Sequence, residues 1–78
     1  MADFRIQGCI EQVGPDRFVA TVVAHPASGP ERTNGHSLWD TSSSSAAACE
    51  TLRRLSEELG ERIRAKGDSI LAVDLDEG

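Results

Sequence analysis

TSSSSAAACETLRRLSEELGERIRAKG, residues 41–67, is the stretch that decides the fold, because its apolar residues recur at helical spacing. At ~100° per residue, five of them fall within a sector of about 80° on a helical wheel. These five are Ala48, Leu52, Leu55, Leu59 and Ile63. The pattern predicts one long amphipathic helix, over about residues 42–66, whose apolar stripe packs against another element.

Both ends of this predicted helix carry termination signals. Thr41 or one of the serines at 42–45 can accept hydrogen bonds from the free N–H groups of the first turn, and Gly67 can adopt the left-handed conformation that ends a helix. Gly60 lies inside the helix, where glycine costs about 1 kcal/mol relative to alanine. We interpret Gly60 as a local weakening rather than as a close approach by another segment.

The polar face of the helix neutralises itself. Glu50 and Arg54, like Glu58 and Arg62, are spaced i,i+4 with the acid first, which is the favourable order. The whole chain has 78 residues and a net charge of −5. This balance disfavours a general nucleic-acid-binding surface.

An antiparallel hairpin is predicted before the helix. Residues 3–13 alternate between apolar and polar, which is typical of a half-buried strand. Gly14, Pro15 and Asp16 interrupt the pattern, and residues 17–25 resume it as a strand that is apolar on both faces.

Two more strands and a loop complete the chain. We expect a flexible loop over 26–35, with Asn34-Gly35 as a tight turn, and a short strand over 36–40 that runs directly into the helix. Residues 70–75 are apolar on both sides, which favours a strand paired on both sides. The order β-β-β-α-β predicts a single α+β domain over 1–78, a two-layer sandwich of an antiparallel sheet with the helix on one face.

One sheet face is then left without a covering helix, and it is the candidate interface. Trp39, Val19, Val23 and Cys9 can share that face and form an apolar patch for a partner or a second copy. The alternative is a different strand register that places the same residues in the core. Strand alternation alone does not decide between the two.

The strand RFVATVV at 17–23, followed by a loop, a short strand and Asp40-Thr41-Ser42 opening an alanine-containing helix, resembles the HicB-type antitoxin domain. That family has a β-β-β-α-β module that is partly related to the double-stranded RNA-binding fold. The resemblance covers roughly residues 5–59 by order of elements, and the loop at 26–35 is longer here. It implies a stand-alone relative of that domain, for which a regulatory module that contacts RNA or DNA is an alternative function.

The residues capable of site chemistry are few. His25 and His36 flank the loop and could meet across a strand pair, with Asp40 or Cys9 as a third group, as a site for a metal or small ligand. No compact ligand spacing such as CxxC or HxxxH is present, so we expect no metal, no cofactor and no catalytic residue. Cys49 and Cys9 are expected to be reduced.

Three functional hypotheses remain. The first is a non-enzymatic bacterial protein that acts by protein–protein contact, as a homodimer joined through the open sheet face or a strand edge. The second is a nucleic-acid-contacting regulatory module related to the HicB-type antitoxins, and the third is a small ligand or metal sensor using His25, His36 and Asp40. Without a signal-like start or a long apolar run, we expect a cytoplasmic location and no membrane contact.

Overall fold

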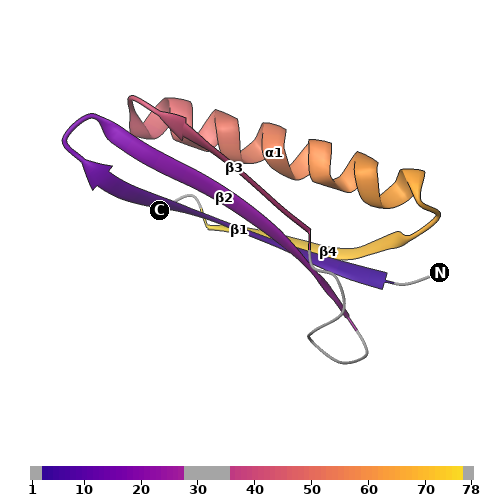
Figure 1. The fold of residues 1–78 in the computed structure, drawn as a ribbon. Helices are drawn as coiled ribbons and strands as arrows, with labels where there is room; N and C mark the ends of the chain where they lie inside the picture. The colour runs from indigo at the N-terminus through magenta and orange to yellow at the C-terminus, as the bar shows by residue number, and fades with distance from the viewer. Residues whose placement is uncertain (1–2, 28–35, 77–78) are drawn as a thin grey trace.

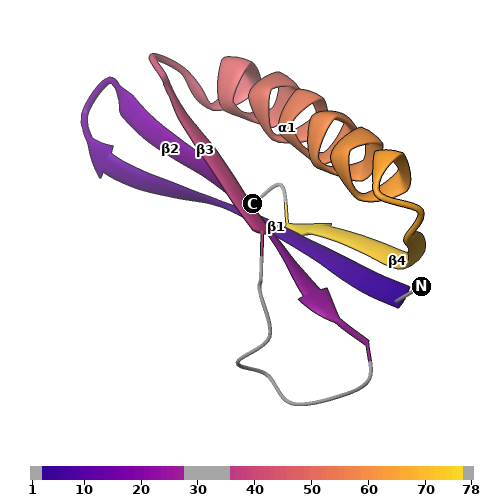
Figure 2. The same cartoon turned by 45° about the vertical axis from the view of Figure 1, so that its right-hand side comes forward.

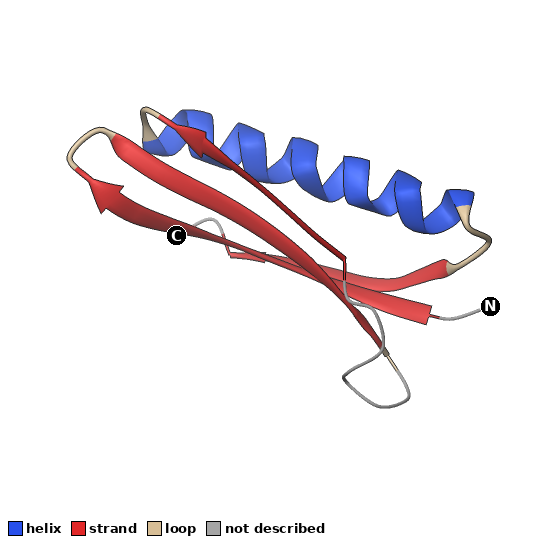
Figure 3. Cartoon of the chain, viewed as in Figure 1, coloured by secondary structure: helices blue, strands red, loops and turns tan. Residues whose placement is uncertain are grey.

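Residues 3–27 and 36–76 are described by a computed structural model, in which four strands and one helix form two layers (Figures 1 and 3). The elements in chain order are β1 (Asp3–Gly14), β2 (Arg17–Pro26), β3 (His36–Ser42), α1 (Ser45–Ala65) and β4 (Ser69–Asp76). The predicted α+β class and element order are confirmed. The expected turn at Asn34-Gly35 lies outside the described residues.

The sheet has the strand order β3-β2-β1-β4 and is mixed. The predicted hairpin is confirmed, since β1 and β2 pair antiparallel with Ile10 opposite Ala20, and β3 pairs antiparallel with β2. Strand β4, however, pairs parallel with β1, so the expectation of a wholly antiparallel sheet needs this correction. Its cause is the helix, which carries the chain across the sheet and returns it in the same direction, as crossover connections do (Figure 2).

The core lies between α1 and one face of the sheet. All five residues of the predicted helical stripe are buried, and the strands contribute alternate residues from β1 and β2. The buried strand side chains are Phe4, Ile6, Ala20, Val22 and Ala24. The helical and strand periodicities therefore meet in a single apolar layer.

Each end of α1 is closed by a specific set of hydrogen bonds. Ser44 is the N-cap, and its side chain accepts from the amide of Ala47 at 3.2 Å. At the other end the amide of Gly67 donates to the carbonyl of Arg64 and the amide of Asp68 donates to Ile63, which is the Schellman arrangement. Gly67 has φ of 86°, so its predicted role as the left-handed residue is confirmed.

Among the described residues no helix is both long and apolar enough to cross a membrane.

Gly60 corrects one sequence interpretation. It is buried on the face of α1 that meets the sheet, and a Cβ atom built there would lie 2.9 Å from Cδ1 of Ile70. Gly60 therefore marks a close approach of β4 to the helix, and the interpretation as mere weakening is wrong. The signal was not readable from the helix alone, because the contacting residue comes ten positions later on another element.

We expect Gly60→Ala to raise the free energy of unfolding slightly, by up to about 1 kcal/mol, because the helix gains and only the end of the Ile70 side chain must move. In an Ile70→Val background, which lacks that Cδ1 atom, the gain should be larger. Urea unfolding of the four proteins measures this coupling. A loss of more than about 1 kcal/mol in Gly60→Ala, with no relief from Ile70→Val, would contradict the expected movement.

Candidate functional site

The face of the sheet opposite α1 is open (Figure 2), and the strand pairing places the four candidate interface residues on that face. Cys9, Thr21 and Trp39 stand side by side across β1, β2 and β3, since Cys9 pairs with Thr21 and Thr21 with Trp39. Val19 and Val23 flank Thr21 on β2 two residues to either side. Trp39 is 67% exposed, so the largest side chain of the chain faces solvent.

The register excludes the alternative that these residues form the core. Leu38, next to Trp39 in β3, pairs with buried Val22 and packs against the helix-side core. Because successive strand residues point to opposite faces, Trp39 must point to the open face. Val19 and Val23 are half-buried there and Cys9 is exposed.

A shallow hollow of about 320 Å³ crosses the open face over the central strand β1. It is lined by residues of three neighbouring strands, namely Gln7, Gly8, Cys9, Thr21, Val23, His25, Asp74 and Asp76. The lining mixes a thiol, an imidazole and two carboxylates with apolar groups. Among the described residues, however, no group of three or more His, Cys, Asp or Glu side chains is arranged to hold a metal ion.

The two histidines do not meet, contrary to the expectation from their positions beside the loop. His25 is exposed on the open face, whereas His36 lies on the helix side, where its ring contacts Phe4 at a centroid distance of 5.8 Å. The reason is register: His36 pairs with Ala24, the buried neighbour of His25, so the imidazoles occupy opposite faces. Asp40 lies four residues beyond His36 on β3, about 13 Å away along the strand.

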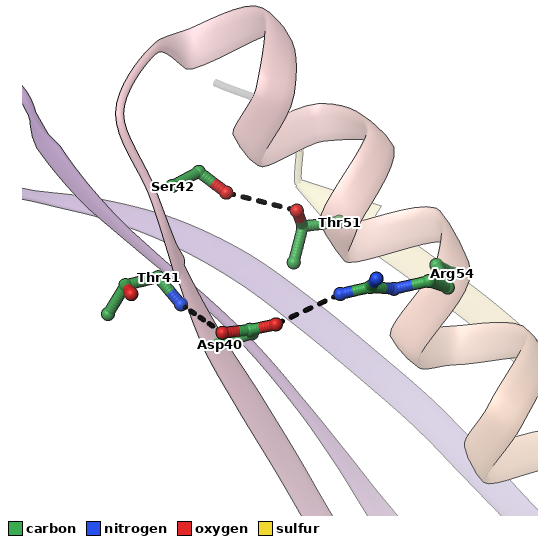
Figure 4. Close-up of polar contacts among 5 residues, drawn as sticks. All are labelled: Asp40, Thr41, Ser42, Thr51 and Arg54. Atoms are coloured by element: carbon green, nitrogen blue, oxygen red, sulfur yellow. Dashed lines mark hydrogen bonds and ion pairs between the residues drawn. The ribbon is translucent and has the colours of Figure 1, made fainter.

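Asp40 instead joins β3 to the helix, as Figure 4 shows. One carboxylate oxygen accepts from the amide of Thr41 at 2.8 Å, and the other accepts from Nη2 of Arg54 at 2.9 Å. Ser42 and Thr51 share a second contact between the same two elements, with their hydroxyl oxygens 3.0 Å apart. This polar cluster positions the start of α1 over the sheet and is structural in character.

The charged face of α1 is largely as predicted. Arg62 pairs with Glu58 at 3.2 Å, which confirms one of the two i,i+4 pairs. Arg54 pairs with Asp40 of β3 rather than with Glu50, so the other predicted i,i+4 pair is replaced by a contact between the helix and the sheet. Both pairs are well exposed, so each contributes little to stability. They do, however, occupy two of the arginines that a nucleic-acid surface would use.

One exposed apolar surface was missed by the sequence reasoning. Strand β4 was predicted to be paired on both sides, yet it forms an edge of the sheet next to β1. Leu71 and Val73 are consequently 56% and 51% exposed. The signal was present in the sequence, since residues 70–73 are all apolar, but the helix crossover that puts β4 at the edge was not foreseen.

Cys9 and Cys49 are not joined by a disulfide bond, and the fold keeps them on different layers.

No family model matches the chain, and neither the curated proteins nor the solved structures contain a significant match. The resemblance to the HicB-type antitoxins therefore stays a prediction. What remains for a functional argument is the surface itself, namely the open face around Trp39 and the edge of β4.

Proposed function

We propose that the protein is a non-enzymatic module of the bacterial cytoplasm that acts by protein–protein contact as a homodimer. The observation that carries the proposal is that, in the part of the chain that the structure describes, α1 covers one face of the sheet and apolar side chains remain exposed elsewhere. Monomeric proteins rarely leave large apolar surfaces in contact with water. Two surfaces offer apolar contact to a second copy, the open face with Trp39, Val19, Val23 and Cys9, and the β4 edge with Leu71 and Val73.

The size of the chain supports the same proposal. A domain of 78 residues buries a smaller fraction of its surface than a larger one, about 60 to 65% of what the unfolded chain exposes. Association with a second copy removes further apolar area from water, and this stabilises the folded chain by mass action. Self-association is therefore favoured both by the surface and by the small core.

Sedimentation equilibrium over a range of concentrations tests the homodimer. We expect the mean mass to approach twice the 8.4 kDa of one chain at high micromolar concentration and to fall on dilution. The thermal midpoint should rise with concentration in parallel, since only the folded chain dimerises. A strict monomer at every concentration, with a midpoint independent of concentration, would overturn the proposal.

The nucleic-acid alternative makes a different prediction. Arg54 and Arg62 already pair with carboxylates, and the net charge is negative, so we expect no binding of labelled double-stranded RNA or DNA. The titration is made at about 50 mM salt, where phosphate contacts are strong. Tight binding with a steep salt dependence would favour the nucleic-acid function over the one proposed.

A further inference from the structure

Strand β4 has one side that no described strand pairs with. Among the described residues it contacts the sheet only through β1, and its exposed side chains include Leu71 and Val73. An apolar edge of this kind is a template for pairing with another chain, and natural proteins usually cover or interrupt it. The helix side of β4 is apolar, with Ile70, Val73 and Leu75, whereas its open-face side carries Asp74 and Asp76. Among the described residues this strand has one neighbour, β1.

We propose that β4 pairs antiparallel with β4 of a second copy, which joins the two sheets into one continuous sheet of eight strands. This rests on the proposed function, because it names the surface through which the homodimer forms. The two-fold axis is perpendicular to the sheet, so both helices lie on one side. Both open faces lie on the other side. Trp39 is on β3, which becomes the outermost strand at each end of the joined sheet.

The register follows from charge and from the direction of the side chains. Directly opposite residues of an antiparallel pair point to the same face. The two-fold axis must therefore lie midway between two copies of the same residue, so that this residue faces itself across the contact. An axis at Asp74 would place the two Asp74 carboxylates directly opposite each other. An axis at Leu75 would place Asp74 of each copy opposite Asp76 of the other. Like charges directly opposite each other destabilise a strand pair.

An axis at Val73 avoids these conflicts. It places Val73 opposite Val73 of the second copy and Leu71 opposite Leu75 of the second copy, so exposed apolar groups meet apolar groups. Ala72 then comes opposite Asp74 of the second copy. An axis at Ala72 would instead place Ala72 of the second copy, and no carboxylate, beside the Ala72 that pairs with Arg5.

Charge complementarity supports the Val73 axis independently. Arg5 pairs with Ala72 in the β1–β4 ladder and is exposed on the open face. Asp74 of the second copy would lie on the other side of Ala72, about 10 Å from Arg5 between Cα atoms. Because Ala72 has a small side chain, the long Arg5 side chain can reach across it to Asp74 of the second copy. The two-fold symmetry makes this ion pair form twice in the dimer. Neither Arg5 nor Asp74 has an ion-pair partner among the described residues.

Val73→Lys with Val13→Lys as its control tests the edge contact. Both valines are 51% exposed, but Val13 lies at the far end of β1, next to the hairpin turn. We expect Val73→Lys to weaken the dimer at least about tenfold in Kd, because two ammonium groups meet at the axis. Val13→Lys should leave Kd within about twofold of the unchanged protein. Circular dichroism confirms that each variant is folded.

A charge exchange tests the register. Arg5→Glu and Asp74→Arg should each weaken dimerisation in sedimentation equilibrium, because each places like charges across the axis. The double variant restores opposite charges and should recover most of the affinity. Recovery of this kind is not expected if either substitution acts only by disturbing the fold. Three outcomes would overturn the register: no effect of the single variants, a loss without recovery, or a monomeric double variant.

The outcomes separate this inference from the proposed function. If the unchanged protein dimerises but Val73→Lys does not weaken it, while Trp39→Lys does, the dimer stands and the β4 contact is wrong. A protein that is monomeric throughout overturns both. The β4 arrangement also predicts that the Trp39 emission maximum stays the same between dilute and concentrated protein. A blue shift on association would place the contact on the open face instead.

Discussion

Leu52→Ala should lower the free energy of unfolding by about 3 to 5 kcal/mol, the upper part of the range for a buried leucine. Leu52 is 0% exposed and lies in the middle of the stripe by which α1 packs on the sheet. The residue it faces on β1 is Gly8, whose built Cβ atom would lie 2.9 Å from Cδ1 of Leu52. Because glycine has no side chain that can move into the vacated space, the cavity stays largely open.

The loss is large relative to the whole stability of so small a chain. At roughly 0.05 to 0.15 kcal/mol per residue, a chain of 78 residues is stabilised by only about 4 to 12 kcal/mol. We therefore expect the thermal midpoint of Leu52→Ala to fall by more than about 10 °C, or the variant to be unfolded at room temperature. Thermal unfolding followed by circular dichroism measures this directly.

Leu71→Ala is the matched control for Leu52→Ala. It removes the same atoms from a leucine that is 56% exposed, so in dilute solution, where the chain is monomeric, it should change stability by less than about 0.5 kcal/mol. If both variants lost the same stability, the core would not be centred where α1 crosses β1. At high concentration Leu71→Ala should become more costly, since the proposed dimer buries this residue.

The two ends of α1 and its buried stripe could be predicted from the sequence because they depend on local chemistry. The spacing of Leu52, Leu55 and Leu59 requires only the period of the helix, and Gly67 requires only its own backbone freedom. The open face was harder. Alternation showed that Val19 and Val23 share a face, but the β2–β3 register was needed to decide whether Trp39 shares the open face with them or lies in the core.

The position of β4 could not be predicted in the same way. Its residues specify a strand with apolar faces, and they carry no information on which neighbour it takes. That choice follows from the path of α1, which begins beside β3 and ends over the opposite edge of the sheet (Figure 1). The close contact of Gly60 with Ile70 depends on the same path. The sequence therefore predicted the elements better than it predicted the contacts between distant ones.

Gly8→Val should destabilise the protein by about 3 kcal/mol, at the upper end of what overpacking a core costs. A Cβ atom built at Gly8 would lie 2.7 Å from Cδ2 of Leu75, 2.9 Å from Cδ1 of Leu52 and 3.0 Å from Cγ1 of Val22. Leu52 and Val22 are fully buried, so they have little room to retreat. Gly8 therefore provides the space into which α1 packs, and valine adds two further methyl groups to the conflict.

Gly14→Val is the matched control, since a Cβ atom there meets only Cβ of Arg17, at an ordinary 3.6 Å, and we expect a change below about 0.5 kcal/mol. Combining Gly8→Val with Leu52→Ala tests the mechanism. The shortened side chain removes one of the three conflicts, and the new valine fills part of the cavity, so the double variant should lose at least about 0.5 kcal/mol less than the two single losses together. Strict additivity in urea unfolding would show that Gly8 and Leu52 do not share the space between α1 and β1.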